Sequence, residues 1–395
     1  MTTTLDLTAL FTETRARSES ICLPLELEDY VVQPVDFVSP PKWHLGHTTW
    51  FFEEMLLKPY LPDYRVFDSQ YGYVFNSYYE SLGARVVRTD RGNLSRPSVN
   101  DVYRYRHHVD EAMLALMATD LPATAHELLE IGIHHEKQHQ ELLLTDIKFI
   151  LGNNPLLPAL DTDWKEDGKL VGSASWIRFR ESVITIGHNG NSFGYDNEFP
   201  EHKQLVPSFQ ISSELVTNGE YLEFIQAGGY QDPQYWHAEG WDWVKTQNIT
   251  APLYWQNVDD TWKRYTLAGL EYLQPDDYVA HVSFYEAFAY AQWRGMRLPT
   301  EFEWEATQDQ FDWGHRWEWT SSAYMPYPGY KKPKGAVGEY NGKFMVNQQV
   351  LRGSSIATPP AHARPTYRNF FHAPLRWQFT GIRLATDHNL TDDQE

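Results

Sequence analysis

The chain has 395 residues, 42% of them hydrophobic, and carries a formal net charge of −20 at pH 7. This length exceeds what one hydrophobic core usually serves, so we expect two domains. The negative charge argues against nucleic-acid backbones and anionic membranes as partners, while a local basic pocket for a small anion stays compatible with it.

The chain contains one cysteine, Cys22, so no disulfide can form within it. The first 20 residues lack a basic segment followed by an apolar run, which predicts that there is no signal peptide. No apolar stretch reaches the roughly 18 residues that a membrane span needs. We therefore expect a cytoplasmic protein, and the sequence does not indicate its oligomeric state.

Residues 1 to about 152 have helical patterns. One helix is expected to begin near Ser39–Pro41, because proline is favoured in the first turn, and another is expected to begin at Ser98. A long third helix follows a predicted capping box of Thr124 and Glu127 and ends at Gly152. Together these segments predict an antiparallel helix bundle.

The composition changes near residues 155–175. Thirteen of the 15 tryptophans lie beyond residue 160, and short strand-like pieces such as SVITIG and VLRGSS alternate with Gly, Pro and Asn turns. One further helix is expected at 283–295. We predict a second domain of the α+β class with much irregular structure.

The stretch IGIHHEKQHQELLLTDIKFI, residues 131–150, holds the most informative motif. His135 and His139 are four residues apart, so on a helix they share one face and can reach the same metal ion. For such a pair, in a helix with apolar flanks, metal binding is favoured over a solvated polar face.

The same residues match the H-E-x-x-H signature of zinc peptidases, in which Glu136 would be the general base. The extended signature requires a glycine and a third histidine downstream, and Leu142 and Thr145 occupy those positions. That version therefore fails, although a more distant glutamate ligand remains an alternative.

The earlier helix offers another third ligand. His44 and His47 lie in KWHLGHTTW, and neighbouring helices of a bundle can bring His47 opposite His135 and His139. Three neutral imidazoles would leave coordination positions open for substrates and oxygen and would favour an anionic ligand such as a thiolate. This ligand set suits Fe(II).

Several segments together resemble a known enzyme family. SPPKWHLGHTTWFFE, FNSYYESLGARVVR and HHEKQHQELLLTDIK resemble the DinB-type four-helix domain of the ergothioneine-biosynthesis sulfoxide synthases. NEFPEH, VTNGEYLEFI, RLPTEFEWE, LRGSS and RNFFHAPLRWQFTGIRLA resemble the formylglycine-generating-enzyme (sulfatase-modifying-factor, C-type-lectin-like) fold that is fused to it. The resemblance covers essentially the whole chain and implies domains at 1–155 and 165–395.

The resemblance implies an activity and a metal site. The family joins a thiol to C2 of the imidazole of Nα-trimethylhistidine (hercynine), using Fe(II) and O2, and produces a sulfoxide. It implies His47, His135 and His139 as iron ligands. Gln138 matches the residue that hydrogen-bonds the substrate imidazole, since an amide can donate to or accept from it.

Further residues of the helical domain are implied to act on the thiol and the oxygen. Tyr78 and Tyr79 match the clade of the family that keeps its tyrosines in this domain, where a phenol would donate a proton and prevent oxidation of the thiol to a sulfinate. Arg85 and Arg88 would bind the carboxylate of the sulfur donor, which is cysteine in that clade.

In the second domain, the resemblance places Asn369, Phe370 and Phe371 at the hercynine site. Aromatic faces suit a quaternary ammonium group, which has no N–H donor, and Asn369 could meet the carboxylate. Formylglycine-generating enzymes work through cysteines, and this domain has none. We therefore expect it to shape a substrate pocket, with RLPTEFEWE forming a buried structural network.

Alternatives remain open at this point. The sulfur donor could be γ-glutamylcysteine, a selenosugar could replace it, or cysteine could join a different histidine carbon, as in ovothiol synthesis. Outside this chemistry, a zinc hydrolase would depend on Glu136, and a non-catalytic lectin-like binding module would not depend on the histidines.

Overall fold

The computed structural model describes residues 6–77, 83–166, 174–332 and 341–387. The chain divides into two compact units. Unit 1 comprises Met1–Thr162 together with Ala357–His362, and unit 2 comprises Asp163–Ile356 and Ala363–Glu395. Within the described ranges, no helix has the length and apolar character needed to cross a membrane.

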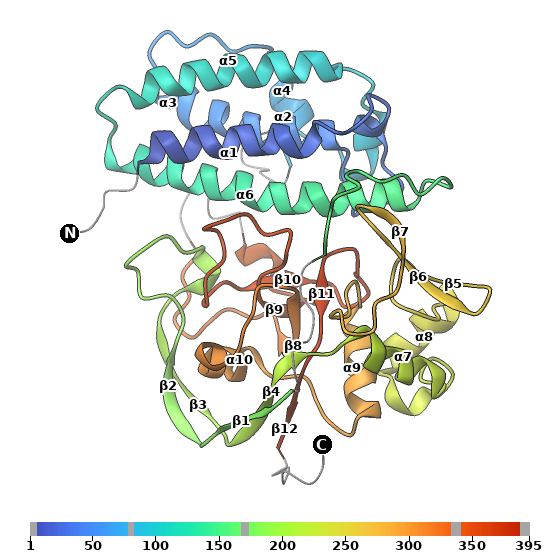
Figure 1. Cartoon of the computed structure of the whole chain (residues 1–395). Coiled ribbons are helices and arrows are strands. Elements are labelled where there is room, and N and C mark those ends of the chain that lie inside the picture. The colour runs from blue at the N-terminus through green and yellow to red at the C-terminus, as the bar shows by residue number, and fades with distance from the viewer. Residues whose placement is uncertain (1–5, 78–82, 167–173, 333–340, 388–395) are drawn as a thin grey trace. The chain divides into compact units, whose positions relative to one another are not determined.

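Unit 1 is helical. Its helical segments are α1 (Leu7–Cys22), η1 (Asp29–Val31), α2 (Pro41–Phe52), η2 (Glu53–Leu57), α3 (Lys58–Tyr60), α4 (Tyr71–Phe75), η4 (Arg88–Asn93), α5 (Val99–Met117) and α6 (Ala123–Gly152). The long helix α6 packs against α1 and α2, and α2 packs against α5, so that the four run side by side (Figure 1). The predicted helix bundle is confirmed.

Local sequence explains where these helices begin. Pro41 occupies the first turn of α2, and Ser98 caps α5 in a reciprocal capping box with Asp101, so both predicted starts are confirmed. The predicted capping box at the start of α6 is wrong. Thr124 lies inside the first turn of α6, because this helix already begins at Ala123 and has no side-chain cap.

Two glycines allow close packing around the ligand-bearing helices. A Cβ atom on Gly46 would lie 2.1 Å from the ring of Phe75, and one on Gly132 would lie 2.6 Å from the ring of Phe52. Both distances are shorter than any real carbon–carbon contact, so only glycine fits. Gly46 therefore lets Phe75 approach α2 directly beside His47.

The segment Ala357–His362 belongs to unit 1, which the sequence-based domain boundaries did not anticipate. It lies along α6, where Lys137 Nζ donates to the carbonyl of Pro360 at 3.0 Å and Thr358 donates to Glu141 at 2.9 Å. Nδ1 of His134 lies 3.0 Å from Nδ1 of His362. His134 is therefore directed toward this segment, whereas its neighbour His135 is directed into the bundle.

Unit 2 is an α+β unit with several small sheets. Its strands are β1 (Trp176–Phe179), β2 (Ser182–Ile186), β3 (His202–Val206), β4 (Phe209–Leu215), β5 (Trp255–Val258), β6 (Thr261–Thr266), β7 (Gly269–Tyr272), β8 (Trp317–Ala323), β9 (Gln349–Gly353), β10 (Asn369–Phe371), β11 (Thr380–Gly381) and β12 (Arg383–Thr386). They form sheets of the orders β1-β4-β12, β10-β9-β8-β11, β2-β3 and β5-β6-β7.

Short helices connect these strands. They are η5 (Asp196–Glu198), α7 (Asn218–Gln226), η6 (Pro233–Tyr235), α8 (Ala238–Gln247), α9 (Phe284–Trp293), α10 (Glu301–Thr307), η7 (Gln308–Gln310) and η9 (Gly342–Phe344). The predicted helix at 283–295 corresponds to α9, whose N-terminus is capped by Ser283. The predicted fold class, a helical domain joined to an α+β domain, is confirmed.

One buried ion pair and one partly buried ion pair hold the motif RLPTEFEWE in unit 2. Glu301 accepts two hydrogen bonds from the guanidinium of Arg368, at 2.8 and 2.9 Å, and Glu303 accepts two from Arg297, at 2.7 and 2.8 Å. Glu301 is almost fully buried. The predicted structural network therefore holds Arg368, the residue that directly precedes Asn369.

Candidate metal centre

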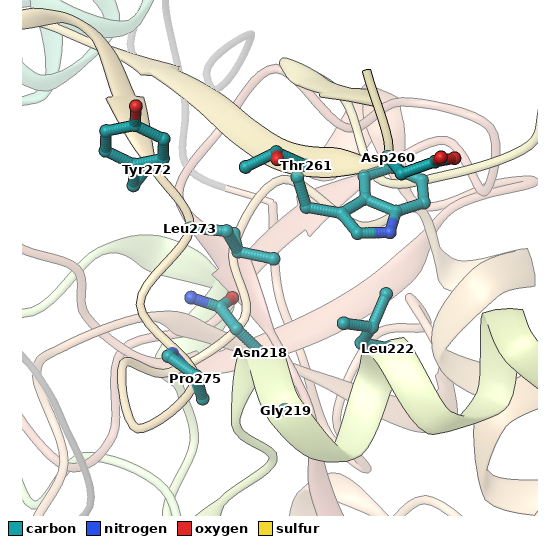
Figure 2. Close-up of a pocket in the computed structure, with 9 residues that line it drawn as sticks. Asn218, Gly219, Leu222, Asp260, Thr261, Tyr272, Leu273 and Pro275 are labelled. Carbon is teal, nitrogen blue, oxygen red and sulfur yellow. The ribbon is translucent and has the colours of Figure 1, made fainter. Parts of the chain in front are cut away.

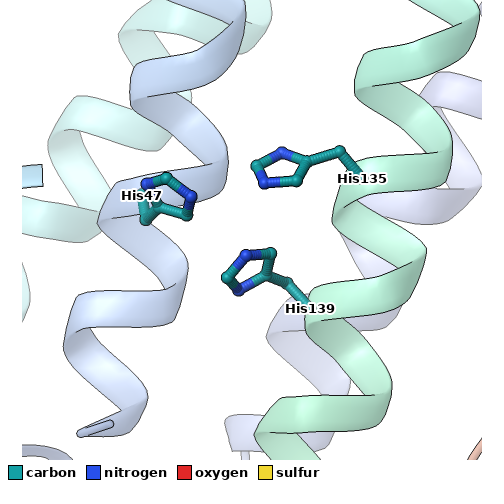
Figure 3. Close-up of side chains that lie close together, drawn as sticks. All are labelled: His47, His135 and His139. Carbon is teal, nitrogen blue, oxygen red and sulfur yellow. The ribbon is translucent and has the colours of Figure 1, made fainter. Parts of the chain in front are cut away.

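Three histidines from two helices of unit 1 meet in the bundle. His47 lies on α2, and His135 and His139 lie one turn apart on α6. One ring nitrogen from each lies within 4.8 Å of the other two, and the three rings point toward one another (Figure 3). These distances suit three ligands around a single metal ion.

The three imidazoles are neutral at physiological pH. Burial lowers the pKa of His135 to about 3. Burial is also the main cause that holds the pKa values of His47 and His139 well below their usual range, with a further contribution from the neighbouring histidines. A neutral imidazole keeps a lone pair on one nitrogen, so each ring can bind a metal ion without first losing a proton.

The ring of His47 has a defined orientation. Its Nδ1 lies 2.7 Å from the carbonyl oxygen of Phe75, and because a carbonyl only accepts, Nδ1 carries the hydrogen. Its Nε2 therefore has the lone pair, and this buried atom has no hydrogen-bond partner within the described part of the chain. Trp43 stacks on the ring at 4.6 Å with an angle of 11° between the planes.

The ring of His139 is held by His44, a histidine outside the cluster of three. Its Nδ1 lies 2.8 Å from Nδ1 of His44, whose Nε2 lies 2.9 Å from Oδ2 of Asp146. The same carboxylate oxygen accepts the backbone N–H of Ser39 at 2.9 Å. These contacts occupy Nδ1 of His139 and leave Nε2 as its other nitrogen.

A buried arginine supports both arrangements. The guanidinium of Arg91 lies 3.3 Å above the ring of Trp43, on which His47 stacks. Arg91 also donates to the hydroxyl of Ser39 at 2.8 Å and to that of Ser77 at 3.1 Å. Arg91 is therefore in contact both with Trp43, whose ring stacks on His47, and with Ser39, whose backbone N–H binds Asp146.

The residues present fit a bound divalent metal ion. Three neutral nitrogen donors converge, and Nε2 of His47 is a buried lone pair for which the described residues provide no donor. A buried polar atom without a partner is costly, and a metal ion would satisfy it. A three-histidine set also leaves further coordination positions open, which is a feature of catalytic rather than structural sites.

Glu136 does not take part in this cluster. It is fully buried and accepts hydrogen bonds from Arg15 at 2.8 Å, Arg106 at 3.1 Å and Ser18 at 2.6 Å. The two arginines lower the pKa of its carboxyl against the opposing effect of burial. Glu136 thus joins α6 to α1 and α5, and its oxygens are occupied by cations rather than available to a metal-bound water.

The remaining predicted residues of unit 1 have different surroundings. Gln138 is half-buried on α6 and directly precedes His139. Arg85 is half-buried, while Arg88 is exposed and donates to the carbonyl of Phe37. Tyr78 and Tyr79 lie outside the described residues.

The predicted hercynine contacts form strand β10 in unit 2. Asn369, Phe370 and Phe371 are each half-buried. The side-chain oxygen of Asn369 accepts the N–H of Phe370 at 2.9 Å, which leaves its NH2 group to donate elsewhere. Phe370 stacks on Tyr324 at 4.0 Å, and Phe371 meets the edge of Trp377 at 5.1 Å. Aromatic faces and an amide donor are thus collected on one short strand.

Unit 2 also has a hollow of about 260 Å³ between α7 and the β5-β6-β7 sheet (Figure 2). Its walls include Leu222, Trp262 and Pro275, and Asp260 lies at the end of the β5–β6 hairpin. None of the predicted metal-ligating, catalytic or substrate-binding residues lines it. We assign no role in the predicted chemistry to this hollow.

Sequence reasoning did not assign a role to His44 or Asp146, although both carried a detectable signal. His44 precedes His47 by three residues, and Asp146 follows His139 by seven, which places each on the same helical face as a predicted ligand. Spacing alone could not show that the two side chains meet, because they come from different helices.

Comparisons with known proteins agree with this two-part organisation. The model of the DinB superfamily matches residues 10–143, and that of the sulfatase-modifying factor enzyme 1-like domain matches residues 178–310. Hercynine oxygenase of Mycolicibacterium smegmatis is 29% identical over 89% of this chain and 91% of that protein. Hercynine oxygenase of Mycobacterium tuberculosis is 31% identical over 65% of this chain and 70% of that protein. Ergothioneine biosynthesis protein 1 of Schizosaccharomyces pombe is 28% identical over 49% of this chain and 27% of that protein.

Proposed function

Because the chain belongs to the hercynine oxygenase family of enzymes, we propose that it joins the sulfur of a thiol to C2 of the imidazole of hercynine. The reaction depends on Fe(II) and O2 and leaves a sulfoxide. Replacing the S–H bond of the thiol and the C2–H bond of the imidazole by a C–S bond removes two electrons and two protons from the substrates, and sulfoxidation removes two more electrons from the sulfur. One molecule of O2 accepts all four, with one oxygen atom entering the sulfoxide and the other leaving as water.

The observation that carries the proposal is the cluster of His47, His135 and His139. Three neutral, buried nitrogen donors from two packed helices match a site for Fe(II) with open positions. When bound there, Fe(II) supplies the activation of O2 that sulfur–carbon bond formation requires. The chain's own contribution is to orient two of the rings: Phe75 and Trp43 hold His47, and His44 holds His139.

Other residues of unit 1 are proposed to bind the substrates. Gln138, adjacent to His139, hydrogen-bonds the hercynine imidazole through its amide. Arg85 and Arg88 bind the carboxylate of the thiol, since a guanidinium fork pairs with a carboxylate bidentately. In this role Arg88 would add a carboxylate to the carbonyl of Phe37 that it already contacts.

Tyr78 and Tyr79 are proposed as the proton donors of the reaction. A phenol that donates to reduced oxygen favours sulfoxide formation over oxidation of the free thiol to a sulfinate. The basis for this assignment is the motif NSYYESLG, which also places the pair directly after Ser77, a partner of Arg91.

In unit 2, Phe370 and Phe371 are proposed to contact the trimethylammonium group and Asn369 the carboxylate of hercynine. The aromatic faces provide the attraction that a cation without N–H donors can use. The NH2 group of Asn369 can donate to a carboxylate, because its oxygen is already occupied by the N–H of Phe370.

Cysteine is the sulfur donor that we favour, on the basis of the tyrosine pair and Arg88. Competing donors are γ-glutamylcysteine and a selenosugar, and the competing product is that of ovothiol-type synthesis. A zinc hydrolase is disfavoured, because the side chain that it would use as a base, Glu136, is bound to Arg15 and Arg106. A lectin-like module would give no reason for three converging histidines.

The test is product analysis with purified protein. The protein is purified anaerobically, loaded with Fe(II), and supplied with hercynine, O2 and either cysteine or γ-glutamylcysteine, and the products are identified by mass spectrometry. We expect the cysteine-derived sulfoxide of hercynine. Product from γ-glutamylcysteine alone would keep the chemistry and change the donor, and no product from iron-loaded protein with either thiol would contradict the proposed function.

A further inference from the structure

A continuous chain of hydrogen bonds runs from His139 to the start of α2. We infer that His44 and Asp146 are positioning residues that hold His139 in the tautomer with hydrogen on Nδ1, so that Nε2 is the metal-binding atom. The inference rests on the proposed metal site. It concerns residues outside the ligand set, and it predicts properties of the protein that do not depend on which thiol is used.

The two ends of the chain determine the direction of every hydrogen bond. A carboxylate only accepts, so Asp146 must receive the N–H of Ser39 and the Nε2–H of His44. A metal ion on Nε2 of His139 requires the hydrogen of that ring to be on Nδ1, which donates to Nδ1 of His44. A neutral His44 that donates with Nε2 and accepts with Nδ1 satisfies both ends at once.

Burial and anchoring make this arrangement rigid. His44 is 3% exposed and Asp146 is 2% exposed, so solvent does not compete for their hydrogen bonds. Asp146 lies two helical turns beyond His139 on α6, and the ring of His44, from α2, lies between them. Ser39 holds Asp146 through its amide and Arg91 through its hydroxyl.

Packing alone does not explain these residue types. A carboxylate and a second imidazole cost free energy to bury, and apolar side chains would fill the same space without that cost. A hydrogen-bonded partner on the outer nitrogen of a ligating histidine orients the ring and raises the electron density that it donates to the metal. Loss of such partners typically weakens metal binding by about 10–100-fold.

The first test uses Co(II) alone as the probe, in competition with a chelator, and records both the dissociation constant and the visible absorption of the bound ion. The variants are His44→Phe, which removes the acceptor, and Asp146→Leu, which removes the carboxylate. We expect each to weaken Co(II) binding by about 10–100-fold and to change the absorption spectrum. The matched control, His126→Phe, removes an exposed histidine of α6 and should change neither.

A conservative variant separates positioning from general damage to the fold. In Asp146→Asn the amide oxygen can still accept from Ser39 and His44, so Co(II) should bind more tightly than in Asp146→Leu. Folding of every variant is checked by circular dichroism and thermal unfolding. Dissociation constants within twofold of the unmodified protein in both folded His44→Phe and Asp146→Leu would overturn the inference.

A second test requires no substitution at the positioning residues. In protein labelled with ¹⁵N-histidine and loaded with Zn(II), the nitrogen shifts of His139 should show hydrogen on Nδ1 and metal on Nε2, and metal on Nδ1 would overturn the inference. A His135→Ala variant shows which proposal has failed. If it binds Co(II) as tightly as the unmodified protein does, the three-histidine site itself is wrong. If it loses Co(II) while His44→Phe does not, only the positioning role is wrong.

Discussion

The carboxylate of Glu136 lies 2.8 Å from the guanidinium of Arg15, although Glu136 directly follows His135 in the chain. Successive residues of an α-helix point about 100° apart, so the side chain next to a ligand faces a different neighbour. Here that neighbour is α1, which carries Arg15. The motif H-E-x-x-H thus has its two histidines in the cluster and its glutamate in an ion-pair network.

This relationship predicts the effect of removing the carboxylate. Glu136→Ala leaves Arg15 and Arg106 as buried charges without their partner, which should lower the free energy of unfolding by about 3–5 kcal/mol. Metal affinity of the folded fraction should be retained. Urea unfolding of this variant and of Glu127→Ala, an exposed glutamate of the same helix, provides the comparison. Equal stability of the two variants would contradict the structural role.

Removal of one ligand should abolish retention of the metal. His139→Ala leaves two imidazoles, and we expect no stoichiometric iron after anaerobic desalting, while His126→Ala retains it. Elemental analysis of the two proteins decides the matter. Normal iron content in folded His139→Ala would show that His139 is not a ligand.

The low pKa values of the histidines predict how the metal-free protein responds to acid. The pKa of His135 is about 3 in the folded protein and 6.5 in an unperturbed histidine. Below pH 6.5 the unfolded state therefore binds the additional proton, so stability falls as the pH falls from 6.5 toward 3. His135 alone should lower the free energy of unfolding by about 2 kcal/mol between pH 7 and pH 5.

The measurement is chemical unfolding of the metal-free protein at both pH values, with His135→Gln as the variant that lacks this titrating group. In this variant, the decrease in the free energy of unfolding from pH 7 to pH 5 should be about 2 kcal/mol smaller than in the unmodified protein.

The same pKa values predict that Co(II) displaces almost no protons from the folded protein at pH 7, which calorimetry in buffers of different ionisation enthalpy can measure. Release of one proton or more for each bound ion would contradict neutral ligands.

Arg88 should act on the affinity for the thiol. Loss of a hydrogen bond to a charged group costs about 1.5–3 kcal/mol, so Arg88→Ala should raise KM for cysteine by about tenfold or more and change KM for hercynine little. Arg104→Ala, which removes another exposed arginine of unit 1, is the control. Equal changes in both KM values would argue against a carboxylate contact.

The tyrosine pair should determine which product forms. Replacement of both Tyr78 and Tyr79 by phenylalanine removes the proposed proton donors, so the product should shift from the hercynine sulfoxide toward cysteine sulfinate. Mass spectrometry of both products after complete consumption of cysteine measures the ratio. A ratio that equals that of the unmodified enzyme would remove this role from the pair.

Local sequence was sufficient for much of the fold. Pro41 and Ser98 act within their own first turns, so the starts of α2 and α5 could be predicted from neighbouring residues alone. The start of α6 could not be predicted in this way. A T-x-x-E pattern shows that these residues are able to cap a helix, but it does not show whether the helix has already begun before them. With Pro122 at the N-cap position, that helix begins at Ala123, two residues before the start that a Thr124 cap would require.

The sequence by itself also determined that His135 and His139 share one face, since helical periodicity sets this without any other part of the chain. Only the tertiary structure decided which histidine of α2 faces His135 and His139. His44 and His47 are three residues apart on the same helix, and their spacing would allow either to approach the pair. The carbonyl of Phe75 and the ring of Trp43 turn Nε2 of His47 toward the cluster, while Asp146 holds His44 behind His139. These partners come from other turns and other helices, and their hydrogen bonds form only when the bundle packs.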